Sequence, residues 1–255
     1  MGNFIKLENF SKLLPYVDMF KEGLIVTVLL AFFTVIIGFV LALVLALMRM
    51  SNFHPFGFLG LTKDGHLRDG GFLYHLSRFN PVSFLATAYV EIIRSTPVVV
   101  QVFIIYYGLG NVFKLPDSSL NRMFWGMVAV GLNSAAYMSE VIRSGIGAVP
   151  GGQMEAARCI GMSHWKAMRH VILPQAVRNI LPAMCNEFVT IIKETSILGM
   201  VGIVELMFRA QSIAKQTYIF LEPYVIAAIM YFIIVFPLSK IIAAVERRMS
   251  KSVTR

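Results

Sequence analysis

Five long apolar runs, separated by shorter polar and basic stretches, make up most of the chain. A hydrocarbon core of about 30 Å needs roughly 20 apolar residues in a helix that rises about 1.5 Å per residue. The pattern therefore predicts an all-α membrane protein with about five transmembrane helices, in a single domain over residues 23–245. The predicted spans are 23–48, 84–109, 124–143, 183–204 and 223–245.

Positive charge is distributed unevenly among the segments that join these runs. Segments rich in Lys and Arg stay in the cytoplasm, and an odd number of spans puts the two termini on opposite sides of the membrane. With the N-terminus outside and the C-terminus in the cytoplasm, the inner segments hold about twice as many Lys and Arg residues as the outer ones. Residues 1–22 are then an extracytoplasmic amphipathic segment rather than a cleavable signal peptide, and residues 246–255 are a cytoplasmic basic tail.

Composition narrows the class of protein further. Of the 255 residues, 57% are hydrophobic and 15% are charged, and the formal net charge is +9, which is unusual for a soluble domain. The histidines form no HExxH pair, the two cysteines lack metal-ligand spacing, and no Gly-rich loop ends in Lys-Ser or Lys-Thr. We therefore predict that the chain is not an enzyme, has no catalytic residues and no metal site, and binds no nucleic acid.

Two cytoplasmic segments stand out within this layout. Residues 53–80 are rich in glycine and contain Pro55, which predicts an irregular insert that is either a surface loop without function or a docking element. Residues 155–174, EAARCIGMSHWKAMRHVILP, predict two short helices. The first covers 153–160, and the second comes after a turn at Gly161 and is capped by Ser163.

The second of these short helices carries an apolar face beside positive charge. Trp165 and Met168 are spaced i, i+3 and therefore share one side of the helix, next to Lys166 and Arg169. Such a helix suits a groove on a partner protein, and it equally suits the surface of an anionic membrane. The spacing of the residues does not decide between these two interpretations.

The order of residues in this stretch resembles the EAA loop of bacterial ABC importer permeases, although Val171 stands where the pattern has Ile. That resemblance implies a type I ABC importer permease fold, in which residues 150–174 form a coupling helix that docks on a cytoplasmic ATP-binding subunit. The residues to which it assigns this coupling role are Glu155, Ala156, Ala157, Gly161, Trp165, Leu173 and Pro174.

Two further stretches resemble motifs of the polar amino acid permeases among these importers. They are RSTP at 94–97, followed by Gln101, and KETS at 193–196. Ser95 and Glu194 stand where that family often has Gly and Asp. The resemblance implies two ATP-binding ABC subunits, a second permease subunit that is identical or homologous, and an extracytoplasmic substrate-binding protein. It also implies that ATP and Mg²⁺ belong to the partner ATPase, that this chain has no cofactor, and that the complex lies in a bacterial plasma membrane.

Polar residues inside the predicted spans indicate an internal pathway. An ionised side chain at the centre of a span costs about 2.5 to 3.5 kcal/mol on insertion scales, so the fourth span does not face lipid on all sides. Asn186, Thr190 and Lys193 form one stripe on that span, and the third span has a similar stripe. The candidate pathway residues are Arg94, Thr96, Gln101, Asn133, Tyr137, Glu140, Asn186, Thr190, Lys193 and Glu194.

Alternatives remain open for some of these residues. Arg94, Glu140, Lys193 and Glu194 are equally compatible with buried ion pairs that fix helix packing. Pro97 lacks an N–H for the carbonyl of Ile93, which predicts a kink in the second span.

The function predicted is that of a membrane-spanning permease subunit of an ATP-driven, binding-protein-dependent importer for polar amino acids. The alternatives are an ion-gradient-driven secondary transporter or channel for a small polar solute, and a membrane scaffold protein.

Overall fold

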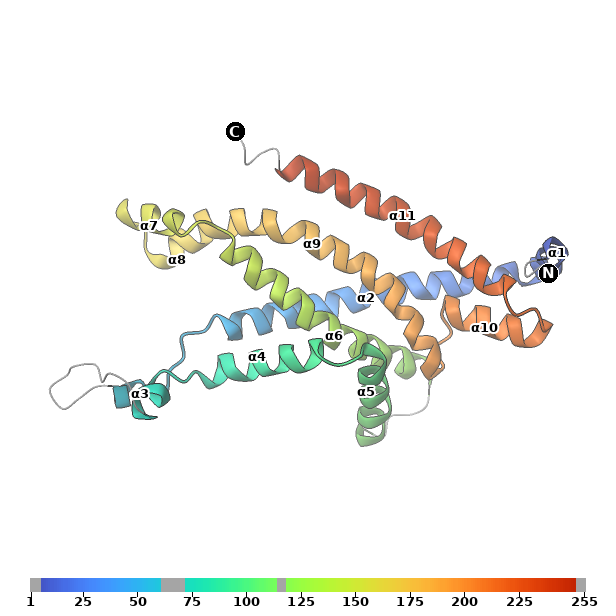
Figure 1. The fold of residues 1–255 in the computed structure, drawn as a ribbon, viewed down its shortest axis with the longest axis horizontal. Coiled ribbons are helices and arrows are strands. Elements are labelled where there is room, and N and C mark those ends of the chain that lie inside the picture. The colour runs from blue at the N-terminus through green and yellow to red at the C-terminus, as the bar shows by residue number, and fades with distance from the viewer. Residues whose placement is uncertain (1–5, 61–71, 114–117, 251–255) are drawn as a thin grey trace.

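The computed structural model describes residues 6–60, 72–113 and 118–250, and the regular elements in these ranges are helices. Figure 1 shows an elongated molecule with the N-terminal segment and α10 at one end and α3, α7 and α8 at the other. The α-helices are α1 Leu7–Leu13, α2 Val17–Arg49, α3 Phe72–Ser77, α4 Pro81–Arg94, α5 Val98–Phe113, α6 Ser119–Gly147, α7 Gly151–Cys159, α8 His164–Ala167, α9 Leu173–Glu194, α10 Leu206–Thr217 and α11 Glu222–Ser250.

The core is built where α2 crosses α6, and α9 packs against both helices. Small residues on the inner face of α2 allow this close approach. A Cβ placed on Gly38 would lie 3.3 Å from the carbonyl oxygen of Gly131, so the two backbones nearly touch there. Apolar side chains such as Leu30, Val130 and Ile191 fill the space around this crossing.

By length and hydropathy, two of the described helical stretches could cross a membrane: Leu7–Arg49 and Glu222–Met249. The pair Pro81–Arg94 and Val98–Leu109 would make a third, although its two helices meet at a bend of 113°. Helices α6 and α9 are long enough, but their polar side chains lower their hydropathy below the same threshold. Both pack among other helices, which gives some of these polar side chains partners within the protein. This measure therefore yields fewer spans than the five predicted.

The helices differ in extent from the predicted membrane spans. Helix α2 begins at Val17, before the predicted span at residue 23, and directly after a 3-10 turn at Leu14–Tyr16. Helix α9 begins at Leu173 and ends at Glu194, whereas the predicted span covers 183–204. A 3-10 helix, Thr195–Val201, comes after α9 and ends at Gly202, whose φ of 82° places it in the left-handed region that favours glycine.

The predicted insert at 53–80 is not wholly irregular, because the 3-10 turn Gly57–Gly60 packs against α3. Helix α10 was not predicted at all. Its N-terminus is held by Glu205, a fully buried carboxylate that accepts backbone N–H groups from Met207 at 2.8 Å and Phe208 at 2.7 Å. Tyr231 of α11 donates to the same carboxylate at 3.1 Å, so this side chain ties α10 to α11.

Candidate functional site

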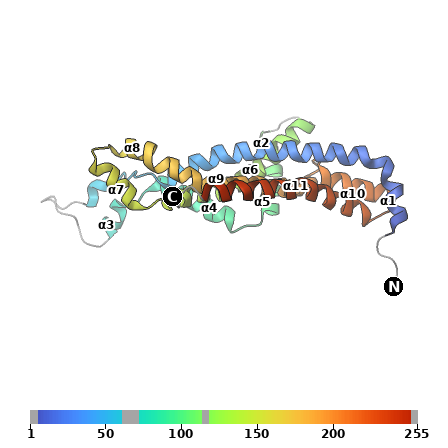
Figure 2. The same ribbon diagram turned by 90° about the horizontal axis from the view of Figure 1, so that it is seen from above.

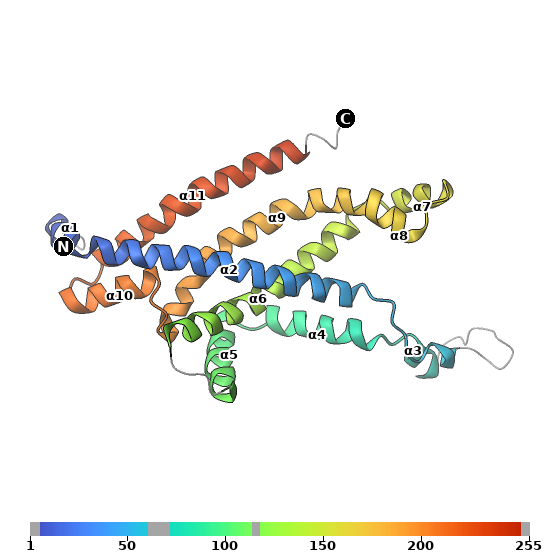
Figure 3. The ribbon, with the colours of Figure 1, turned by 180° about the vertical axis from the view of Figure 1, so that it is seen from behind.

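The EAA stretch forms two short helices at one end of the molecule (Figures 1 and 3). Helix α7 closes with hydrogen bonds from the backbone N–H of Gly161 to Arg158 at 3.0 Å and from Met162 to Ala157 at 3.1 Å. Gly161 has a φ of 85°, in the left-handed region that glycine adopts freely and that β-branched residues avoid. Ser163 then caps α8 by accepting the backbone N–H of Lys166 at 3.4 Å. The predicted turn and cap are therefore confirmed.

The second short helix is continuous with α9. Residues 168–172 extend α8 as a π-helical turn that leads directly into α9, with Pro174 in the first turn of α9. Because Pro174 has no N–H for the carbonyl of His170, a widened turn is a suitable way to continue the helix at this position. A displacement of α8 would consequently be transmitted to α9 along one continuous helical backbone.

Two large apolar side chains are exposed on this loop. Trp165 is 71% exposed, and Ile160, beside the Gly161 turn, is exposed as well. Met168, by contrast, packs inward against the cluster around Ile172 and Ala176. Trp165 and Met168 therefore do not present one shared exposed face, because Met168 is packed against Ile172 and Ala176 while Trp165 is exposed.

The other coupling candidates lie on both sides of the loop. Glu155 and Ala156 are exposed on α7, whereas Ala157 is buried against the rest of the chain. Leu173 and Pro174 are exposed at the start of α9. Sequence reasoning did not select Ile160, although an isoleucine directly before a helix-ending glycine in a polar stretch was a visible signal.

The second predicted span is broken rather than kinked, because α4 ends at Arg94 and α5 begins at Val98. Gln101 lies inside this bend and is buried. Its side-chain NH2 group lies within hydrogen-bonding distance of the carbonyl of Ile93 at 2.7 Å, the carbonyl of Thr96 at 3.0 Å and the Thr96 hydroxyl at 2.7 Å. The Ile93 carbonyl is the group that Pro97 leaves without a helical partner, so Gln101 supplies the missing donor.

Asn133 completes this network from α6, where its side-chain amide donates to Oε1 of Gln101 at 2.8 Å. Three of the predicted pathway residues, Thr96, Gln101 and Asn133, are thus brought together, as a pathway would require. Their polar groups, however, bond to each other and to the backbone of the bend. The network fixes the angle between α4 and α5 and attaches that bend to α6.

Arg94 and Tyr137 meet at the surface beside this bend. The guanidinium of Arg94 lies 5.6 Å from the centre of the Tyr137 ring, which is a cation–π geometry. Both side chains remain exposed in the chain. Arg94 also stands at the C-terminus of α4, where the helix dipole favours positive charge.

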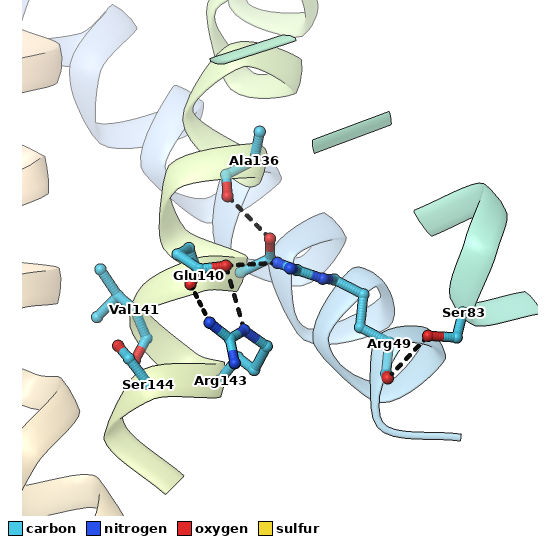
Figure 4. Close-up of polar contacts among 8 residues, drawn as sticks. Arg49, Ser83, Ala136, Glu140, Val141, Arg143 and Ser144 are labelled. Atoms are coloured by element: carbon cyan, nitrogen blue, oxygen red, sulfur yellow. Dashed lines mark hydrogen bonds and ion pairs between the residues drawn. The ribbon is translucent and has the colours of Figure 1, made fainter. Parts of the chain in front are cut away.

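Glu140 belongs to an ion cluster at the C-terminal end of α2 (Figure 4). Arg49 of α2 reaches Oε2 of this carboxylate at 2.6 Å, and Arg143 pairs with Oε1 from the next turn of α6. The hydroxyl of Ser83 on α4 donates to the carbonyl of Arg49 at 3.1 Å. The cluster therefore joins α2, α4 and α6. Sequence reasoning missed Arg49, whose place directly after the first apolar run was the available signal.

The polar stripe on α9 is, by comparison, more exposed. Asn186 and Lys193 are exposed, and Thr190 between them donates to the backbone carbonyl of Asn186, on its own helix, at 3.2 Å. Glu194 is half-buried in the last turn of the same helix. Glu187, which sequence reasoning left out of the pathway, accepts a hydrogen bond from Ser134 of α6 at 2.9 Å.

A polar cavity of about 490 Å³ adjoins this stripe between α9 and α11. Asn186 lines it together with Arg178, Asn179 and Ser239. The volume exceeds that of a single amino acid, so a small polar solute could be accommodated. Sequence reasoning did not find Arg178 and Asn179, because they precede the apolar run from which the fourth span was predicted.

The fold and these polar surfaces are those of an all-helical membrane protein with an exposed EAA loop. The profile of the family described as "Binding-protein-dependent transport system inner membrane component" matches residues 70–251, and the chain belongs to this family. It is therefore a transport subunit of the bacterial inner membrane rather than an enzyme. Membership implies ATPase and binding-protein partners, and it decides against the secondary transporter, channel and scaffold alternatives.

Relatives cover nearly the whole chain. The arginine transport system permease protein ArtQ of Bacillus subtilis strain 168 is 35% identical over 96% of this chain and 98% of its own length. The nopaline transport system permease protein NocM of Agrobacterium fabrum is 38% identical over 94% of this chain and 88% of its own length. A crystal structure of an amino acid ABC transporter with histidines contains a chain that is 38% identical, with a TM-score of 0.77 and coverage of 96% of this chain and 99% of that one.

Proposed function

We propose that this permease imports polar amino acids, as part of a complex with two ATP-binding subunits, a second permease that is identical or homologous, and an extracytoplasmic binding protein. The observation that carries the proposal is the exposed EAA loop, which continues through one helix into the polar stripe of α9. Relatives named for arginine, glutamine and nopaline transport support the substrate class. ATP and Mg²⁺ bind the partner ATPase.

The proposed topology has five spans: α2, the bent pair α4 and α5, α6, α9 and α11. The N-terminus is outside and the C-terminus is in the cytoplasm, which puts α7 and α8 on the cytoplasmic side with the ATPase. The excess of Lys and Arg in the segments placed inside supports this orientation. Helices α6 and α9 are tolerated as spans in spite of their polarity, because their polar sides face protein and the pathway.

Within this topology, the substrate pathway runs along the polar groups that remain accessible. Asn186, Thr190 and Lys193 offer both donors and a positive charge on one side of α9, which suits the carboxylate of a zwitterionic amino acid. Arg94 and Tyr137 add a second accessible polar surface beside the bend. Thr96, Gln101 and Asn133 support this surface by holding the bend, while Glu140 and Glu194 contribute charge near the two ends of the pathway.

Coupling results from the continuity of the helices. When the ATPase subunits bind ATP, they displace α7 and α8, and the π turn carries this displacement into α9 and its polar stripe. Glu155, Ala156 and Trp165 contact the ATPase directly, Gly161 shapes the loop, and Ala157 anchors it to the permease. Leu173 and Pro174 mark the start of the transmitting helix.

The proposal is tested by reconstituting the purified importer in liposomes and measuring uptake of radiolabelled arginine, glutamine, histidine and glutamate. Uptake should require internal ATP and the binding protein, and an ionophore that collapses ion gradients should leave it unchanged. Gly161→Val should abolish ATP-dependent uptake because valine does not adopt a φ of 85°, whereas Gly161→Asn should retain most of it since asparagine tolerates this region. Uptake that persists without ATP would refute the proposal.

A further inference from the structure

The insert between α2 and α4 is held at its base by hydrogen bonds between the residues that precede and follow it. The side-chain amide of Asn80 donates to the carbonyl of Ser51 at 2.6 Å, and it lies 3.2 Å from the Ser51 hydroxyl. Asn80 also caps α4 by accepting the backbone N–H of Ser83 at 3.0 Å. The two segments of chain that enter and leave the insert are therefore joined at its base, and the described residues 52–60 and 72–79 lie beyond that junction.

Phenylalanine side chains cover the described part of this insert. Phe58 is 69% exposed and Phe72 is 78% exposed, although the 3-10 turn and α3 that carry them pack against each other. Phe53, Phe56 and Phe79 are exposed as well. Isolated exposed apolar residues are ordinary, but a group of large aromatic side chains on one small module is typical of a surface that another molecule covers.

The insert extends from the same end of the molecule as the EAA loop. Figures 1 and 2 show α3 reaching about as far along the long axis as α7 and α8, on a different side of the bundle. It thus extends beyond the ends of α2 and α4, away from the middle of the bundle. A partner that covers α7 and α8 from that end would also come near α3.

The chemistry of the insert fits a protein partner better than a membrane surface. Trp and Tyr are the aromatic residues enriched at the membrane interface, whereas the insert carries Phe at its most exposed positions. Residues 52–80 also contain only one more basic than acidic residue, which is too little positive charge to hold the segment on anionic lipid. Aromatic side chains that fill pockets are, however, characteristic of protein interfaces.

We propose that the 3-10 turn Gly57–Gly60 and α3 form a second docking element for the ATP-binding subunit, which the side chains of Phe58 and Phe72 contact beside the EAA loop. The inference rests on the proposed function, because it takes the ATPase to be the protein at this end. In this arrangement the EAA loop transmits movement, and the insert adds affinity and selects which ATPase is bound.

The test measures binding of the importer's own purified ATPase subunit to the permease in nanodiscs. Phe58→Ser combined with Phe72→Ser should weaken binding about tenfold, since truncating central aromatic contacts is commonly that costly. Phe220→Ser is the matched control, because Phe220 is similarly exposed, at 66%, and follows directly after α10, which lies at the opposite end of the molecule from α3 (Figure 1). Gly161→Val reports separately on the EAA loop.

A photo-crosslinking amino acid at position 58 gives a second measurement that does not depend on affinity. A crosslink to the ATPase, absent when the same amino acid stands at position 220, supports the proposal. A crosslink to lipid or to another permease copy, or unchanged ATPase binding by the double variant, overturns it. If Gly161→Val alone loses the ATPase, the proposed function stands without the second docking element, and if wild type binds no ATPase, the proposed function itself fails.

Discussion

The helices of this bundle carry two groups of polar residues, which differ in how many of their hydrogen bonds are made within the chain. At the bend between α4 and α5, Gln101 and Asn133 are buried and bonded to each other. On α9, Asn186 and Lys193 are exposed. A polar group whose partners lie within the chain stabilises the fold, whereas one without such partners is available to a solute. Polarity within a span therefore does not by itself identify a substrate contact.

The largest effect should come from breaking the hydrogen-bond network of Gln101 and Asn133 at the bend between α4 and α5. Gln101→Leu leaves the carbonyls of Ile93 and Thr96 and the amide of Asn133 without their partner in a buried place. Because each such group costs about 1 to 3 kcal/mol, we expect a loss of about 3 kcal/mol or more and a much lower melting temperature in detergent. Uptake should be lost with the fold.

Gln216→Leu serves as the control for that variant, since Gln216 is exposed on α10. It should melt close to wild type. A Gln101→Leu protein that melts and transports like wild type would show that the bend does not depend on the network. Gln101→Asn should behave nearly as badly as the leucine variant, because the shorter side chain cannot reach the same carbonyls.

The exposed polar residues of α9 should respond in the opposite way: their replacement should reduce transport while the fold is retained. Lys193→Met removes a charge that is exposed within the chain, so the melting temperature should change little. If Lys193 binds the substrate carboxylate, loss of a charge-assisted hydrogen bond worth about 1.5 to 3 kcal/mol should lower uptake by at least about tenfold. Uptake by reconstituted importer measures this, with Lys215→Met of α10 as the control. Wild-type uptake by Lys193→Met would remove this residue from the pathway.

The sequence predicted those features that depend on local pattern. Gly161 and Ser163 fix the EAA turn through their own backbone preferences, and both were recognised. The break at Pro97 was underestimated, because only the structure shows Gln101 closing it from the next helix. Helix α10 was missed, since its cap, Glu205, is stabilised by Tyr231 across a distance in sequence that no local pattern conveys.

The ion cluster of Glu140 is intermediate between the two groups in its burial, since its charged side chains are only partly buried. Its side chain binds Arg49, which is 10% exposed, and Arg143, which is 48% exposed (Figure 4). A double-mutant cycle of Glu140→Gln with Arg49→Gln, measured by thermal unfolding, should give a coupling of about 1 kcal/mol or more. The equivalent cycle with Arg143→Gln should give less, because solvent screens an exposed pair. Equal couplings would mean that burial does not distinguish the two arginines.

The smallest effect expected is that of Thr190→Val, a conservative substitution in the polar stripe of α9. The Thr190 hydroxyl donates to the carbonyl of Asn186, one turn earlier on its own helix. That carbonyl keeps its helical bond when the hydroxyl is removed, so the melting temperature should shift by no more than the equivalent of about 0.5 kcal/mol. Uptake should fall about threefold if the hydroxyl contacts the substrate, since a neutral hydrogen bond contributes about 0.5 to 1.5 kcal/mol. Thr217→Val on α10 gives an upper limit for the local helix effect, because the Thr217 hydroxyl donates to the carbonyl of Ile213 at 2.8 Å and also accepts the backbone N–H of Ile219 at 3.3 Å. If both variants transport like wild type, the accessible stripe begins and ends at Asn186 and Lys193, and Thr190 only spaces them.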